Sequence, residues 1–188
     1  LTAYGDIYAD DFILPAGNLR ESRSGSKRGD VIVVTKCPPN LSESEQLSIQ
    51  KKLKLGKNQE LYFSCIAYDD CIYSENKKIK LSEVQVENKL LLAGIAKPEP
   101  FFKHLKNPND ICLTYPDHHH FSENDIQEIK NKAQNSIIIT TEKDYVRLKG
   151  SLPSEQLFYL PIQSSYLSEE DQFDKKIKNY VGTSTANR

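Results

Sequence analysis

Hydrophobic residues along the chain gather in short blocks separated by polar stretches. Five blocks have the length of one strand, at residues 31–35, 90–96, 111–113, 137–140 and 157–160. The longer blocks are unbroken, whereas a strand with one face in water alternates apolar and polar residues. Unbroken blocks of this length are typical of strands buried on both faces. The pattern therefore predicts a parallel sheet with helices on both sides.

The polar stretches between the blocks carry helical signals. Helices are expected at residues 42–55, 98–105, 122–133 and 168–182, each opening on a residue that favours a helix start. Gly56 and Gly182 are the expected stops of the first and last of these helices. The alternation of strands and helices predicts an α/β fold, with a mainly parallel sheet in three α/β/α layers. Residues 60–84 differ, because they are aromatic and β-prone, and they predict a pair of extended segments.

Composition narrows the class of protein. The chain has 188 residues, with 25 Lys and Arg against 26 Asp and Glu. Its charges nearly cancel, so no overall positive potential favours the binding of nucleic acid. No apolar run approaches the ~20 residues of a membrane helix, and no signal peptide is visible. The four cysteines have no CxxC spacing, so we expect reduced thiols in a cytoplasmic protein. The chain begins at Leu1 and lacks methionine, so we expect a processed start or a piece of a longer protein.

Three loops carry candidate chemistry. The loop at 14–29 holds four cations within nine residues, Arg20, Arg23, Lys27 and Arg28, which could bind a phosphate or form a solvated basic surface. The other two loops directly follow predicted strands, where α/β proteins place their sites. Residues 115–121 read Tyr-Pro-Asp-His-His-His-Phe, and Asp117 beside His118 suits proton transfer or a structural turn. Residues 140–147 offer hydroxyls, Lys143 and Asp144 for anion contacts, although Thr141 could equally cap a helix.

These loops, taken in order, resemble the tetraacyldisaccharide 4′-kinase family of lipid A biosynthesis. The resemblance rests on LPAGNLRES at 14–22 with KRGDVIVVTK at 27–36, LLLAGIAKPEPFF at 90–102, YPDHHHF at 115–121 and IIITTEKDYVRL at 137–148. It implies a kinase that transfers the γ-phosphate of ATP, with Mg²⁺, to the 4′-hydroxyl of a tetraacyldisaccharide 1-phosphate. The product is lipid IVA, and the hosts are Gram-negative bacteria.

The resemblance also implies an architecture. The family is a P-loop NTPase fold of two α/β/α lobes joined by a two-stranded extended linker. Its P-loop, acidic metal-binding motif and aspartate base lie in the amino-terminal half. This sequence has no G-x-x-x-x-G-K-[ST] motif, so it looks like the carboxyl-terminal half. We therefore expect ATP and Mg²⁺ to bind mainly outside these residues, and these residues alone to be inactive.

The motifs suggest roles for particular residues. Arg20 and Glu21 match the family's L-P-x-G-x-L-R-E motif near the phosphates and sugar, and Arg23 is grouped with them as a phosphate-binding candidate. Asp117 and His118 match its D-H motif, in which the histidine pairs with the aspartate base of the other half. The family's T-x-K-D-x-V-R motif has a supporting role at the cleft, and its matches are Thr141, Lys143, Asp144 and Arg147. No metal ligand is expected among these residues.

The resemblance divides the chain into four expected segments. Residues 1–57 would complete the nucleotide-binding lobe, 58–86 would form the linker, 87–182 the carboxyl-terminal lobe and 183–188 a frayed tail. The expected partners are ATP and the lipid A disaccharide precursor, with no nucleic acid. The longer protein would contact the cytoplasmic face of the inner membrane peripherally. A metal-dependent phosphoesterase using Asp117, His118 and His119, or a non-catalytic binding module, remain alternatives.

Overall fold

The chain divides into two compact units. The computed structural model describes residues 1–84, 88–168 and 170–186. One unit comprises Leu1–Ala67 with Gln163–Arg188, and the other is Tyr68–Ile162. The polypeptide therefore passes from the first unit to the second after residue 67 and returns after residue 162. Among the described residues, no helix is both long and apolar enough to cross a membrane.

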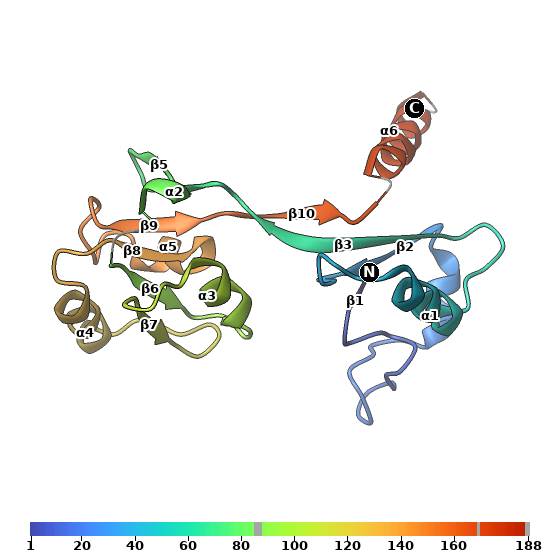
Figure 1. The fold of residues 1–188 in the computed structure, drawn as a ribbon. Coiled ribbons are helices and arrows are strands. Elements are labelled where there is room, and N and C mark those ends of the chain that lie inside the picture. The colour runs from blue at the N-terminus through green and yellow to red at the C-terminus, as the bar shows by residue number, and fades with distance from the viewer. Residues whose placement is uncertain (85–87, 169, 187–188) are drawn as a thin grey trace. The chain divides into compact units, whose positions relative to one another are not determined.

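The second unit is built on a six-stranded sheet in the order β5-β4-β9-β8-β6-β7 (Figure 1). The parallel part consists of β6 (Leu90–Ala93), β7 (Ile111–Thr114), β8 (Ile138–Thr141) and β9 (Leu157–Leu160). Two short strands, β4 (Cys71–Tyr73) and β5 (Lys78–Lys80), add an antiparallel edge beside β9. The predicted, mainly parallel sheet is thus confirmed.

Helices cover both faces of this sheet, because alternate residues of each buried strand point to opposite sides. On one face Leu91 and Ile139 pack with Phe101 and Leu105 of α3 (Glu99–Leu105). On the other face the neighbouring strand residues meet α4 (Glu123–Ala133) and α5 (Glu142–Leu148), in a cluster that includes Leu90, Leu92, Ile129, Ile138 and Leu148. The unit therefore has the three α/β/α layers that the sequence predicts.

The first unit is built on a four-stranded sheet in the order β1-β2-β3-β10. Its strands are β1 (Thr2–Ala3), β2 (Val31–Thr35), β3 (Glu60–Tyr68) and β10 (Ile162–Tyr166), and β2 lies parallel to both β1 and β3. The helix α1 (Glu43–Leu53) packs its Ile49 and Leu53 against Val34 and Phe63. A 3₁₀ helix, η1 (Arg23–Arg28), lies in the long loop between β1 and β2.

An aromatic cluster places the last helix with this first unit. Phe173 of α6 (Glu170–Ala186) contacts Tyr62 of β3 and Tyr166 of β10, with ring centroids 5.1 and 4.5 Å apart respectively. Lys176 also forms an ion pair with Glu60 at 2.5 Å. Gln163–Arg188 therefore belongs to the same unit as Leu1–Ala67. The lobe and linker roles expected for residues 1–57, 58–86 and 87–182 remain predictions, and residues 85–87 lie outside the described residues.

Four local details differ from the sequence-based expectation. The strand β10 was not expected, because its sequence Ile-Gln-Ser-Ser-Tyr lacks an apolar block. The helix α1 ends at Leu53, since Lys54 adopts the left-handed conformation (φ 50°) before Gly56 is reached. A short helix, α2 (Leu81–Val84), follows β5 where extended chain was expected. The last helix continues past Gly182, because an interior glycine costs only about 1 kcal/mol.

Candidate functional site

The candidate site of the second unit lies where three parallel strands end. Ala93 of β6 pairs with Thr114 of β7, and Leu92 of β6 pairs with Thr140 of β8, so the three carboxyl ends share one edge. The loop 115–121 follows β7, and α5 begins directly after β8. Loops at this edge of an open α/β sheet commonly form the binding site.

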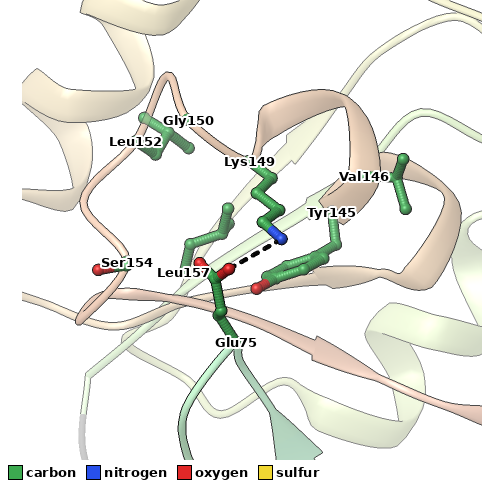
Figure 2. A pocket seen from close by; sticks show the side chains of 8 residues that line it. All are labelled: Glu75, Tyr145, Val146, Lys149, Gly150, Leu152, Ser154 and Leu157. Carbon is green, nitrogen blue, oxygen red and sulfur yellow. Dashed lines mark ion pairs between the residues drawn. The ribbon is translucent and has the colours of Figure 1, made fainter.

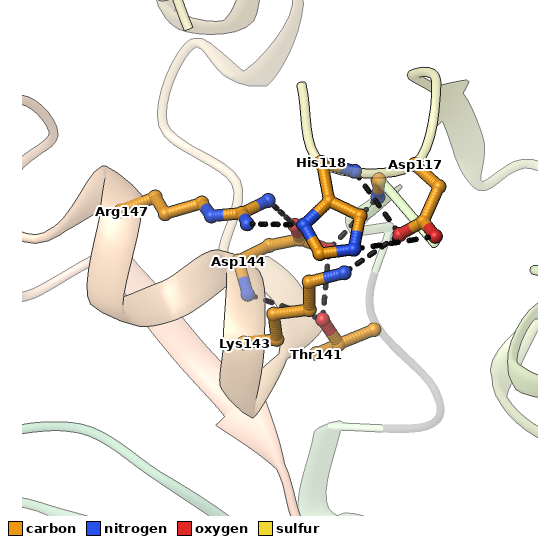
Figure 3. A network of polar contacts seen from close by, with 7 residues as sticks. Asp117, His118, Thr141, Lys143, Asp144 and Arg147 are labelled. Carbon is orange, nitrogen blue, oxygen red and sulfur yellow. Dashed lines mark hydrogen bonds and ion pairs between the residues drawn. The ribbon is translucent and has the colours of Figure 1, made fainter. Parts of the chain in front are cut away.

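The buried carboxylate of Asp144 links the chain after β6 to the end of β8 (Figure 3). Its side chain is fully buried, and Oδ2 accepts hydrogen bonds from the Gly94 amide at 2.8 Å and the Thr141 hydroxyl at 2.7 Å. Oδ1 accepts no hydrogen bond within the described residues and lies 3.7 Å from a guanidinium nitrogen of Arg147. Thr141 also caps α5 by accepting the Asp144 amide. Asp144 and Thr141 therefore organise the site from inside.

Gly94 is the residue that sequence reasoning did not single out. A Cβ at this position would lie 3.0 Å from Asp144 Oδ1 and 3.5 Å from the Pro116 carbonyl oxygen. The glycine thus allows the loop after β6 to approach both the buried carboxylate and the loop after β7. The sequence signal that could have identified Gly94 is its position directly after a predicted buried strand.

The accessible part of the cluster contains an ion pair. Lys143 Nζ lies 2.6 Å from Asp117 Oδ1, and the two side chains are 37% and 39% exposed. The hydrogen bond from Lys143 lowers the pKa of Asp117 below its ordinary value of 3.8, and the nearby His118 and its amide act in the same direction. Asp117 is therefore held as a carboxylate at neutral pH.

His118 is presented between this ion pair and Arg147. Its backbone has φ 61°, which places the residue in the left-handed region, and its side chain is 75% exposed. Nε2 lies 3.7 Å from Asp117 Oδ2, and Nδ1 lies 3.5 Å from a guanidinium nitrogen of Arg147. The imidazole pairs electrostatically with Asp117 only when it is protonated. Figure 3 shows this ring between the two side chains.

The structure brings six predicted site residues together in this cluster: Asp117, His118, Thr141, Lys143, Asp144 and Arg147. Lys143 and His118 lie beside the Asp117 carboxylate, and Arg147 lies beside His118 and the buried Asp144. Such a surface can bind an anionic group through Lys143 and Arg147 and can exchange a proton at His118. His119, in contrast, faces Asp125 at 3.1 Å, away from this set of contacts. Within the described residues, no three His, Cys, Asp or Glu side chains gather as a metal site would require.

The other three predicted residues lie in the first unit. Arg20, Glu21 and Arg23 line one shallow hollow of about 280 Å³, together with residues such as Tyr8 and Ile32. Glu21 pairs with Arg28 at 2.6 Å, and both side chains are largely exposed. The Arg23 Nε donates to the Asp11 carbonyl at 2.7 Å. The basic loop therefore offers cations at a surface and lacks a buried carboxylate like Asp144 among its described contacts.

A larger hollow of about 490 Å³ lies elsewhere on the second unit (Figure 2). It is bordered by Tyr145, Leu152 and Leu157, and Lys149 forms a 3.1 Å ion pair with Glu75 across it. It contains none of the predicted site residues.

The second unit is a three-layer α/β fold with a cluster of charged side chains at the carboxyl edge of its parallel strands. The family model described as tetraacyldisaccharide-1-P 4′-kinase (LpxK) matches residues 4–182. The chain belongs to this family.

Comparison with individual proteins agrees with the family. Tetraacyldisaccharide 4′-kinase of Flavobacterium johnsoniae is 58% identical over 181 residues, which cover 96% of this chain and 53% of the relative. That of Bacteroides thetaiotaomicron is 38% identical, covering 100% of this chain and 55% of the relative. The crystal structure of LpxK from Aquifex aeolicus, described as in complex with ATP, matches with TM-score 0.60 at 21% identity and covers 90% of this chain and 48% of that one. The chain thus spans about half the length of the curated relatives it matches.

Proposed function

We propose that this chain works as part of a tetraacyldisaccharide 4′-kinase. The reaction transfers the γ-phosphate of ATP to the 4′-hydroxyl of a tetraacyldisaccharide 1-phosphate and gives lipid IVA. The observation that carries the proposal is the cluster around Asp117, whose residues come from two of the motifs that resemble this family. Family membership and the relatives' names support the same reaction. ATP and Mg²⁺ are its proposed co-substrate and cofactor.

The cluster suits phosphoryl transfer because this reaction depends mainly on positioning and charge stabilisation. Lys143 and Arg147 are basic side chains at the carboxyl edge of the sheet, where phosphate oxygens could bind. His118 has an exposed imidazole that could hold the carboxylate of a catalytic base supplied by another part of the kinase. Arg20 and Arg23 would serve the phosphates from the basic loop. Asp144 and Thr141 would support the site without touching the substrate.

The substrate class also suggests a location. A tetraacyl lipid resides in a membrane, so the kinase is proposed to work at the cytoplasmic face of the inner membrane through peripheral contact. The described residues provide cations at two surfaces, and either could face anionic groups of the lipid.

The proposal is tested by transfer of labelled phosphate from ATP to a tetraacyldisaccharide 1-phosphate. In a full-length kinase carrying this sequence, His118→Ala should lower kcat by about 10²–10⁴-fold, the usual scale for acid–base partners. His120→Ala, which removes an exposed neighbouring histidine, is the matched control and should leave kcat unchanged. Residues 1–188 alone should transfer no phosphate. Activity of these residues alone, or an unchanged kcat in His118→Ala, would contradict the proposed roles.

A further inference from the structure

The three consecutive histidines have different surroundings, and the middle one is the most enclosed. His118 is 75% exposed at its side chain, whereas His119 is 25% exposed. The His119 ring stacks on Tyr115 with centroids 4.9 Å apart and meets the edge of Phe121 at 5.2 Å. Its Nε2 lies 3.1 Å from Asp125 Oδ2. His119 thus contacts both the chain before the turn and the helix after it.

Both anchoring points of this ring are themselves fixed. Tyr115 donates its amide to the Ala93 carbonyl at 2.9 Å, which ties the start of the loop to the end of β6. Asp125 accepts the Ser122 amide and the Ser122 hydroxyl, both at 2.7 Å, and so closes the capping box of α4. These bonds and the contact with His119 lower the pKa of Asp125 to about 2. The partner of His119 is therefore a permanent carboxylate locked at a helix start.

The short turn between Tyr115 and His119 depends on being held at both ends. It contains only Pro116, Asp117 and His118, and the turn is closed by a bond from the His119 amide to the Pro116 carbonyl at 3.2 Å. His118 adopts φ 61°, a region that residues other than glycine occupy when the surrounding structure holds them there. Without an anchor after the turn, Asp117 and His118 could rotate away from Lys143.

We propose that His119 is a positioning residue, which fixes the turn that presents Asp117 and His118 to Lys143 and Arg147. It acts through the Tyr115 stack on one side and the Asp125 carboxylate on the other, and it touches neither substrate nor reacting atoms. The importance of this role for catalysis rests on the proposed kinase function. The geometric role itself does not, so the two can be tested separately.

The first test measures the pKa of Asp117 in residues 1–188 by carbon-detected NMR titration of its carboxyl group. His119→Phe keeps an aromatic ring beside Tyr115 but loses the bond to Asp125, whereas His119→Gln keeps a donor and loses the stack. With the turn released, the Lys143–Asp117 bond should break and the Asp117 pKa should rise toward 3.8 in both variants. The exposed neighbour supplies the control, because His120→Gln should leave that pKa unchanged.

The outcomes separate positioning from simple stabilisation. If the His119 variants melt at lower temperature but keep the native Asp117 pKa while folded, the residue only stabilises the fold and the proposal is wrong. If one variant fails to fold, the other decides, because the two remove different contacts. A second readout is the full-length kinase, where His119→Phe should lower kcat by about 10–100-fold with little change in KM for ATP. A kinase without activity in any form would overturn the proposed function but not the pKa result.

Discussion

The two loop regions that carry the predicted site residues are built in opposite ways. In the second unit, the Lys143–Asp117 ion pair joins the loop after β7 to α5, and the buried Asp144 carboxylate joins α5 to the chain after β6. The stack of His119 on Tyr115 closes the loop after β7 on itself. In the first unit, the loop between β1 and β2 presents Arg20 and Glu21 at the surface, and Glu21 pairs with an exposed Arg28. One region is organised around a buried carboxylate, and the other presents its charged side chains to solvent.

The difference shows that residues of one motif need not share one role. Thr141, Lys143, Asp144 and Arg147 lie within seven consecutive positions, yet Asp144 is fully buried whereas Lys143 is about one-third exposed. Removing an inner residue should therefore damage the fold first, and removing an outer one should damage binding. The same distinction predicts that removing a cation of the basic loop lowers activity and leaves the stability of the fold unchanged.

The largest effect is expected from Asp144→Ala. This substitution leaves the Gly94 amide and the Thr141 hydroxyl without their acceptor in a buried place, so the free energy of unfolding should fall by about 2–3 kcal/mol. Urea denaturation followed by circular dichroism measures this change. The matched control is Glu142→Ala, which removes an exposed carboxylate two residues earlier in α5 and should lower the free energy of unfolding by at most about 1 kcal/mol. Equal losses in the two variants would refute the inner role of Asp144.

A smaller, pH-dependent effect is expected from Lys143→Met. Lys143 is the main cause of the lowered Asp117 pKa, so this pKa should rise toward 3.8 in the variant. Because the folded-state pKa is the lower one, the ion pair stabilises the native protein above about pH 3.8, and this contribution disappears as the pH falls through the folded-state pKa. The variant should therefore lose part of the acid dependence of its stability. The measurement is the melting temperature of both proteins at pH 3 and at pH 6. An equal drop in melting temperature between these pH values in the variant and the unsubstituted protein would contradict the role of Lys143.

Much of the second unit was predictable because its signals are local. Unbroken apolar blocks marked β6, β8 and β9, and Ser122 with Asp125 marked the capping box that the structure contains. Asp117 and His118 follow one predicted strand, and Thr141 to Arg147 follow another. Their positions at strand ends therefore predicted that they lie at the same edge of the sheet. The strand β10 escaped prediction because its pairing with β3 depends on long-range contacts, not on its own composition.

The roles within the site were less predictable than its location. Three consecutive histidines carry the same chemistry in the sequence, and only the fold shows that His118 and His119 face different partners. Likewise, no sequence signal distinguishes the buried Asp144 from the accessible Asp117, since each follows a strand and lies near a cation. Burial depends on how closely the Gly94 loop approaches, which is a property of the assembled sheet.

The smallest effect on stability is expected from Arg20→Ala, which tests the outer character of the basic loop. Arg20 is exposed, so the free energy of unfolding should change by no more than about 0.5 kcal/mol. For comparison, Arg147→Ala removes a cation 3.7 Å from the buried Asp144. It should lower the free energy of unfolding by about 1 kcal/mol more than Arg20→Ala does. In the full-length kinase, Arg20→Ala should nevertheless lower kcat by about 100-fold, the scale for losing one charge-stabilising donor. If Arg20→Ala has normal activity, Arg20 belongs to an ordinary solvated surface. If Arg20→Ala instead lowers the free energy of unfolding, Arg20 makes contacts that stabilise the basic loop.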